Sequence, residues 1–286
     1  MVAAALAAGW RPQTVFLREE AADELGERLG LRPTAAPGAA AADEEAGPAA
    51  GQGGPGVFAV SERVAARIST LETPADVVAV LPLPERRPLS SLLGPATSPK
   101  TAALRRAEGE ASPAGDGPGV LVVYVDGVQD PGNVGTLLRA AAAFGVSAVV
   151  TSAGSADPFA PKAVRASMGA LFALPVFPGL PLADVTDQLP AATVYGLAAH
   201  GGTPLGAAEL RRPAVLVVGA ERAGLSRAAL AHVGEIVTIP LPAVASAGVE
   251  SLNAGVAGAI ALYEFSRRSP GAPEDPSRRS SAAQEG

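Results

Sequence analysis

Six apolar runs after residue 118 predict strands, at residues 119–127, 147–152, 173–177, 192–199, 214–220 and 235–240. Between and after them lie segments with helical periodicity, at residues 133–145, 157–170, 183–189, 226–232 and 254–265. The first run, GVLVVYVDG, is apolar without alternation, as expected of a strand buried on both faces. Strands that alternate with helices predict a parallel sheet with helices on both faces. Ligands of such sheets bind at the carboxyl ends of the strands.

Two of these helices carry recognisable start signals. We expect Asn133 to cap the helix at residues 133–145, which Gly145 ends. We expect Asp157 to cap the helix at residues 157–170, with Pro158 in its first position.

The last predicted helix, residues 254–265, is small and apolar on nearly every face. A helix with so little charge should be buried, against the rest of the fold or against another subunit. Glu250, Ser251 and Asn253 precede it and are natural capping residues. Its glycines and alanines would also let another backbone or a flat ligand come close. The residues themselves leave both interpretations open.

The first third of the chain predicts a smaller α/β unit, residues 1–93, with few elements for its length. Between residues 32 and 56 the sequence is nearly all Ala, Pro, Gly and acidic residues, which predicts a flexible insertion. Residues 94–118 are rich in Pro, Ala, Gly and Ser and predict a linker. Residues 119–268 then form the second domain, and the tail at 269–286 is expected to be disordered.

Composition narrows the possible functions. The 286 residues carry a net charge of −6, which argues against a general electrostatic nucleic-acid binder but not against a local arginine patch. Cysteine is absent, and the two histidines, His200 and His232, lack ligand-like spacing, so we expect no metal. The N-terminus is apolar but short and lacks a basic leader, and no run is long enough to span a membrane. We expect a cytoplasmic protein.

Polar residues and glycines cluster after three of the predicted strands. The first cluster is DGVQDPGNVG, from Asp126 to Gly135, with Arg139 further along the helix. The second is VGAERAGLS, from Val218 to Ser226, and the third combines Ile239 and Leu241 with residues 250–253. The first two clusters have purely structural alternatives, namely a helix cap at Asn133, a surface arginine at Arg139 and a solvated turn at Glu221. Dinucleotide, P-loop and nucleophile-elbow motifs are absent.

Taken together, DGVQDPGNVGTLLRAAAAFG, LVVGAERAGLS and IPLPAVASAGVESLNAGVAGAIALYE resemble the three motifs of the SpoU (TrmH-like) RNA ribose methyltransferases of the SPOUT class. The resemblance covers roughly residues 120–267 and implies an α/β knot, with the C-terminal end threaded through a loop. The stretch VSERVAARISTLETPADVVAVLPLP is similar to the end of the ribosomal-protein-like RNA-binding domain that many members carry in front. The family also implies a homodimer.

The resemblance implies that S-adenosylmethionine binds through Gly219, Ile239 and Leu252, with Leu241 close by. The family's functional polar positions match Asn133, Arg139, Glu221, Ser251 and Asn253. The reaction would move the methyl group to a ribose 2′-hydroxyl, a poor nucleophile that needs placement and help losing its proton.

Roles follow from the same resemblance. Because a guanidinium is a weak base, we prefer the hypothesis that Arg139 clamps an RNA phosphate and stabilises the forming alkoxide. Asn133 would orient the ribose, and Glu221 would hold Arg139 or the substrate. Ser251 and Asn253 would fix the loop and the cofactor. Arg165 is either an RNA contact or a solvated helix charge.

The chain departs from the family pattern in two places. Ala220 stands where members often have Asn, a change that a neighbouring backbone group can compensate. The first strand and part of the first helix of the front domain look absent, which implies either a start codon assigned too far downstream or an incomplete front domain.

Three functions therefore compete. The front domain favours ribosomal RNA over transfer RNA as the substrate of a ribose methyltransferase, in housekeeping or in antibiotic resistance. A transfer RNA 2′-O-methyltransferase is the enzymatic alternative. The non-enzymatic alternative is a catalytically silent RNA-binding or ribosome-assembly protein. The joint presence of the five polar residues argues against it.

Overall fold

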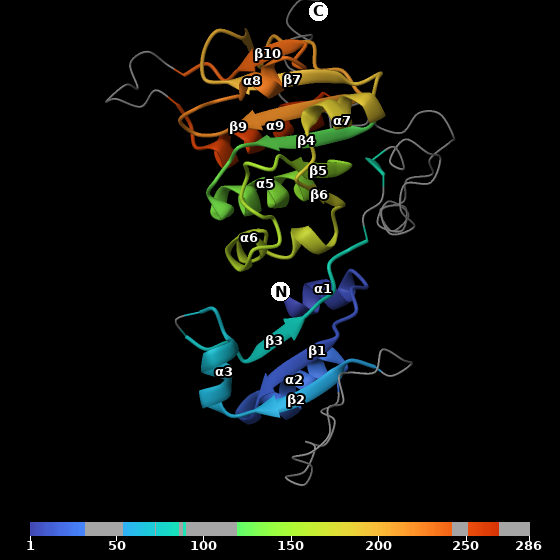
Figure 1. Cartoon of the computed structure of the whole chain (residues 1–286), viewed down its shortest axis with the longest axis vertical. Coiled ribbons are helices and arrows are strands. Elements are labelled where there is room, and N and C mark those ends of the chain that lie inside the picture. The colour runs from blue at the N-terminus through green and yellow to red at the C-terminus, as the bar shows by residue number, and fades with distance from the viewer. Residues whose placement is uncertain (32–53, 72, 86–87, 90–118, 242–250, 269–286) are drawn as a thin grey trace, which may run out of the picture. The chain divides into compact units, whose positions relative to one another are not determined.

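The computed structural model describes residues 1–31, 54–71, 73–85, 88–89, 119–241 and 251–268. The chain divides into two compact units, Met1–Glu85 and Arg86–Gly286, each shown in Figure 1. The sequence placed the end of the first domain at residue 93, but Leu89 is buried in a core cluster of the second unit. The predicted linker and tail lie outside the described residues, as does most of the predicted insertion. Gly56, which we assigned to that insertion, is the first residue of a strand.

The first unit is a three-stranded sheet with helices. Its strands are β1 (Thr14–Arg18), β2 (Gly56–Val60) and β3 (Val77–Val80), in the order β2-β1-β3. β2 runs parallel and β3 antiparallel to β1. The helices are α1 (Val2–Ala7), α2 (Ala22–Leu29) and α3 (Glu62–Ile68), with a 3-10 turn η1 (Glu19–Ala21) before α2. Apart from η1, helices and strands alternate along the chain in the order α1-β1-α2-β2-α3-β3.

A seven-stranded parallel sheet forms the centre of the second unit, in the order β6-β5-β4-β9-β7-β10-β8. Its strands are β4 (Leu121–Asp126), β5 (Ala148–Thr151), β6 (Val176–Pro178), β7 (Thr193–Ala198), β8 (Thr203–Pro204), β9 (Ala214–Gly219) and β10 (Glu235–Thr238). Every residue of β4 is buried, as its continuous apolar sequence predicted. The six predicted strands are confirmed; β8 was missed because two residues carry no periodicity.

Helices cover both faces of this sheet, as predicted. They are α5 (Pro131–Ala143), α6 (Pro161–Ala166), α7 (Leu182–Gln188), α8 (Arg227–Leu230) and α9 (Ala254–Arg267), with a 3-10 turn η3 (Ala170–Phe172). On one face, Leu121 and Val123 of β4 share a core cluster with residues of α5 and α9. On the other face, Val122 and Tyr124 share a cluster with residues of α7 and α8. Alternate side chains of one strand thus enter two cores.

Two helix starts differ from our predictions. α5 begins at Pro131, and its cap is Asp130, whose carboxylate accepts a hydrogen bond from the Gly132 backbone N–H at 3.0 Å. Asn133 is therefore not the cap, which leaves its side chain available for other contacts. Asp157 accepts from the Phe159 N–H at 2.8 Å, but this closes a turn and α6 starts only at Pro161. Pro158 and Pro161 both suit the first position of a helix, and Pro161 occupies that position in α6.

The glycines of α9 pack against α5. A Cβ atom at Gly255 would lie 3.0 Å from Thr136, and one at Gly258 would overlap Leu137. The small residues therefore serve the close approach of two helices, one of the two interpretations that the sequence left open. Asn253 caps α9 by accepting from the Val256 N–H at 3.2 Å. Within the described ranges, no helix has the length and apolar character needed to cross a bilayer.

Candidate functional site

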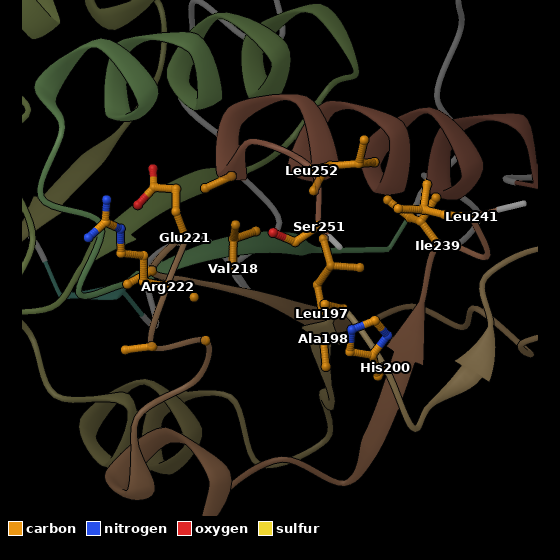
Figure 2. Close-up of a pocket in the computed structure, with 17 residues that line it drawn as sticks. Leu197, Ala198, His200, Val218, Glu221, Arg222, Ile239, Leu241, Ser251 and Leu252 are labelled. Carbon is orange, nitrogen blue, oxygen red and sulfur yellow. The ribbon is translucent and has the colours of Figure 1, made fainter. Parts of the chain in front are cut away.

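A cavity of about 340 Å³ opens at the carboxyl ends of β7, β9 and β10. Four chain segments line it, and Figure 2 shows how their side chains lie. They are residues 197–200 after β7, 218–224 at the end of β9, Ile239 and Leu241 after β10, and Ser251, Leu252, Ala254 and Ala257 at the start of α9. The cavity lies where ligands of parallel sheets bind.

The structure brings together the four residues expected to contact the cofactor. Gly219, Ile239, Leu241 and Leu252 all line the cavity, although they come from three separate segments. Of the five residues expected to be catalytic, Glu221 and Ser251 also line it. The remaining three, Asn133, Arg139 and Asn253, are not among the lining residues.

A chain of hydrogen bonds connects two of those three to the cavity. Asn133 Nδ2 donates to Oε1 of Glu221, and Asn253 Nδ2 donates to Oδ1 of Asn133 at 2.8 Å. The Oδ1 atom of Asn253 in turn caps α9 by accepting from the Val256 N–H. Each amide therefore uses both its donor and its acceptor, which fixes its orientation. Three loops that follow different strands are joined at one point beside the cavity.

A tight hairpin carries Glu221 to this point. Ala220 and Gly224 exchange two backbone hydrogen bonds, of 3.1 and 2.8 Å, so that residues 221–223 form the tip. Gly224 has a φ of 66°, a left-handed value that favours glycine. A Cβ atom at Gly219 would collide with the Gly224 carbonyl group. The glycines at positions 219 and 224 are thus needed for the shape of the hairpin.

Asp126 anchors the far side of this hairpin. The residue is only 6% exposed, and its carboxylate accepts from the Ser226 N–H at 2.6 Å and from Ser226 Oγ at 3.2 Å. Ser226 Oγ also accepts from the Ala229 N–H at 3.1 Å, which caps α8. The end of β4 therefore holds the segment that follows Glu221. Sequence reasoning placed Asp126 in a polar cluster but gave it no role.

Lys162 holds the start of α5, where Asn133 lies. Its Nζ atom is 2.8 Å from Oδ1 of Asp130, the cap of α5. The hydrogen bond from Lys162, followed by that from the Gly132 N–H, lowers the pKa of the Asp130 carboxyl group. An anionic cap also suits the positive end of a helix dipole.

Arg139 lies six positions after Asn133 on α5 and is exposed. No hydrogen bond or ion pair joins it to Glu221, Asn253 or any other residue that the structure describes. Arg165, near the end of α6, is half-buried. The structure therefore does not bring Arg139 into the network of Asn133, Glu221 and Asn253.

Sequence reasoning missed the contribution of β7. Leu197, Ala198, Ala199 and His200 line the cavity, yet this strand end carries one polar side chain and no cluster. His200 was considered only as a metal ligand. The available signal was its place at the carboxyl end of a predicted parallel strand. Over the ranges that the structure covers, no group of three or more His, Asp or Glu side chains could hold a metal ion.

Residues 120–263 match the model of the SpoU rRNA Methylase family. Among curated relatives, the 23S rRNA guanosine 2′-O-methyltransferase RlmP of Bacillus subtilis is 33% identical over 210 residues, which cover 73% of this chain and 71% of that protein. The 23S rRNA guanosine 2′-O-methyltransferase RlmB of Xylella fastidiosa (strain Temecula1) is 39% identical over 150 residues, or 52% of this chain and 59% of that protein.

Solved structures extend the likeness to 93% of the chain. An AdoMet-bound rRNA methyltransferase from Sinorhizobium meliloti superposes with a TM-score of 0.66 at 26% identity, over 84% of that chain. A TrmH-family putative RNA methyltransferase from Porphyromonas gingivalis superposes with a TM-score of 0.65 at 30% identity, over 87% of that chain.

Proposed function

Because the chain belongs to the SpoU rRNA methylase family, we propose that it transfers a methyl group from S-adenosylmethionine to a ribose 2′-hydroxyl of ribosomal RNA. The observation that carries this proposal is the convergence of the segments after β7, β9 and β10 and before α9 on one cavity, beside the hydrogen-bonded Asn133, Glu221 and Asn253. The activities named for RlmP and RlmB support ribosomal RNA as the substrate.

The cavity fits S-adenosylmethionine in size and lining. Its volume of about 340 Å³ lies within the range of small-molecule sites, about 300–1,000 Å³. Leu197, Ile239 and Leu252 offer apolar surface to a flat adenine ring, and the backbone groups at the strand ends can bind its polar edge. We propose that Gly219, Ile239, Leu241 and Leu252 hold the cofactor. The AdoMet bound to the Sinorhizobium meliloti relative supports this choice of ligand.

When bound, S-adenosylmethionine supplies an electrophilic sulfonium methyl group. The methyl group would pass to the ribose oxygen, the sulfur would keep the electron pair of the broken carbon–sulfur bond, and water would take up the hydroxyl proton. Asn133, whose amide is fixed by Glu221 and Asn253, orients the ribose. Ser251 lines the cavity beside Leu252, and we assign it the role of fixing this loop next to the cofactor.

Arg139 binds an RNA phosphate in this mechanism. Its guanidinium is exposed and, among the described residues, unpaired, so a phosphate can approach it without displacing a protein partner. Guanidinium and phosphate groups match in charge and in bidentate geometry. A cation held near the reacting oxygen stabilises the negative charge that develops there.

We further propose a knotted chain and a homodimer. β10 pairs with β7, but α9 packs against α5 and residues that precede and follow the gap between β10 and α9 line the same cavity, an arrangement that suits a C-terminal end threaded through a loop. Val256, Ile260 and Tyr263 of α9 are 46%, 37% and 51% exposed and follow helical spacing, so they form an apolar stripe that suits a second copy of the chain.

The first unit acts in this proposal as an RNA-binding domain similar to a ribosomal protein. Arg63 and Arg67 lie one helical turn apart on α3, and both are exposed. They offer cations to a phosphate backbone in a unit whose α2 carries acidic residues in its first turn.

Transfer of a radiolabelled methyl group to total ribosomal RNA tests the proposed function. We expect incorporation with the wild-type chain and a large loss with Arg139→Ala. Transfer RNA serves as a second substrate, and exclusive labelling of it would replace ribosomal RNA in the proposal. Calorimetry with S-adenosylmethionine alone addresses the silent alternative, because a catalytically silent RNA-binding protein need not bind the cofactor. Mapping ribose methylation in RNA from cells with and without the protein identifies the target nucleotide.

A further inference from the structure

Arg222 lies at the tip of the hairpin that residues 220–224 form and is one of the residues that line the cavity. Its side chain is exposed, and no described residue forms a hydrogen bond or an ion pair with its guanidinium. The two backbone hydrogen bonds between Ala220 and Gly224 fix the hairpin, so the position of Arg222 does not depend on side-chain contacts. The site thus presents an arginine on a rigid backbone.

The neighbouring carboxylate forms no ion pair with this arginine. Glu221 accepts its hydrogen bond from Asn133 on α5, and no ion pair joins it to Arg222. In Figure 2 the side chains of Glu221 and Arg222 lie together at one end of the lining, and His200 lies at the other. Among the described residues that line the cavity, Arg222 is the only arginine or lysine.

We propose that Arg222 binds a phosphate of the substrate RNA beside the target nucleotide. This inference rests on the proposed ribose methylation, which requires the nucleotide to enter next to Asn133 and Glu221. The chain has a net charge of −6, so the RNA backbone needs local cations at the place where it comes closest to the protein. The guanidinium fork matches two phosphate oxygens and stays charged at every pH of interest.

The carboxylate of the cofactor is the competing partner, and the geometry disfavours it. In Figure 2 the Arg222 guanidinium points away from Leu197, Ile239 and Leu252, which belong to the apolar part of the lining. Arg222 is exposed, as expected for a residue that meets a large ligand at the edge of a site.

Arg222→Ala tests the proposal in the full chain, with Arg227→Ala as the matched control. Arg227 is also exposed and lies in α8, five positions further on, but it does not line the cavity. For Arg222→Ala we expect the KM for ribosomal RNA to rise about tenfold, which corresponds to a loss of about 1.4 kcal/mol of binding free energy. The plot of log affinity against log salt should become shallower by about 1. Arg227→Ala should leave both within about twofold, and Arg222→Lys should recover part of the loss.

Two results would overturn the proposal. One is an Arg222→Ala variant with unchanged RNA affinity and salt dependence. The other is a loss of S-adenosylmethionine affinity in calorimetry with an unchanged KM for RNA, which would assign Arg222 to the cofactor. Direct binding of ribosomal RNA, measured without the methyl donor, keeps this test separate from the proposed reaction. A wild-type chain that transfers no methyl group would contradict the reaction, while the comparison of RNA affinities would still decide the role of Arg222.

Discussion

Asn133 donates a hydrogen bond from Nδ2 to Oε1 of Glu221, which joins the first turn of α5 to the hairpin after β9. The two residues are 88 positions apart in the sequence. Asn133 Oδ1 at the same time accepts from Asn253 Nδ2, the cap of α9. Asn133 is therefore the central member of the network, because it alone contacts both partners.

Asn133→Asp should disrupt this network at neutral pH. The substitution removes the amide donor and places a second carboxylate against Glu221, so like charges meet where a hydrogen bond was. We expect methyl transfer to fall about 100-fold, for a loss near 3 kcal/mol, the upper end for hydrogen bonds to charged groups. Part of the activity should return as the pH is lowered and one carboxyl group of the pair binds a proton.

The measurement is kcat for methyl transfer against pH, with thermal melting to show that the variant folds. Asn133→Ala is the matched control, because it removes the donor without adding charge and should show no recovery at low pH. Equal pH profiles for the two variants would contradict the close approach of residues 133 and 221.

The charge of Asp130 should contribute to stability in a defined pH window. Its pKa is lowered in the folded protein, mainly by the hydrogen bond from Lys162, so folding favours the anion. The contribution is therefore complete above the ordinary carboxyl pKa of about 4 and is lost as the pH falls through the lower folded value. Asp130→Asn keeps an acceptor for the Gly132 N–H but removes the charge.

Urea unfolding at a series of pH values checks this prediction. Above about pH 5 the wild type should be more stable than Asp130→Asn by a constant amount, and below about pH 4 the two should converge. Lys162→Ala should reproduce the loss seen above pH 5, since it removes the partner of the same ion pair. A constant difference down to the lowest pH would show that the charge of Asp130 has no part in it.

Gly219→Ala should distort the hairpin formed by residues 220–224. The new Cβ atom would collide with the Gly224 carbonyl group, which belongs to the backbone and cannot rotate away. Strain from such overpacking costs about 1–3 kcal/mol, and we expect most of it to appear as weaker binding of S-adenosylmethionine, about tenfold or more. Calorimetry with the cofactor measures this directly.

Gly206→Ala is the control for that experiment. A Cβ atom at Gly206 would meet nothing within 4 Å, so the same change in backbone entropy occurs without a collision. Unaltered cofactor affinity in Gly219→Ala would contradict the prediction, because the hairpin would then accommodate the new Cβ atom without a cost in binding free energy.

The sequence predicted the strands of the second unit and the edge of the sheet at which the site lies. Apolar runs such as GVLVVYVDG predicted the strands, and parallel pairing brings their ends to one edge. Gly219 and Ile239 lie at or just after the ends of two such strands, whereas the family resemblance, and not periodicity, implied that Leu252 joins them at a cofactor site. Periodicity could not predict which proline starts α6, because Pro158 and Pro161 are both suitable. The helix starts at Pro161 and packs closely against Gly135 of α5.

Details of the site depended on contacts that no local pattern records. His200 and its neighbours were missed because the end of β7 is nearly apolar, and their role is defined only by the segments opposite them. Asn133 looked like a helix cap, a local function that Asp130 performs instead. The reach of a long side chain such as Arg139 is also undetermined by sequence, since its rotamers sweep several ångströms.

Ile260→Glu should separate the proposed homodimer. Ile260 lies at the centre of the apolar stripe on α9, between Val256 and Tyr263, and is 37% exposed in the single chain. A carboxylate there would be buried without a partner in the interface, at a cost of several kcal/mol. We expect the wild type to sediment as a dimer and the variant as a monomer at micromolar concentration. Leu230→Glu on α8 is the matched control, because Leu230 is 47% exposed and lies outside the stripe. A dimer that survives in Ile260→Glu but dissociates in Leu230→Glu would move the interface to the opposite face of the sheet.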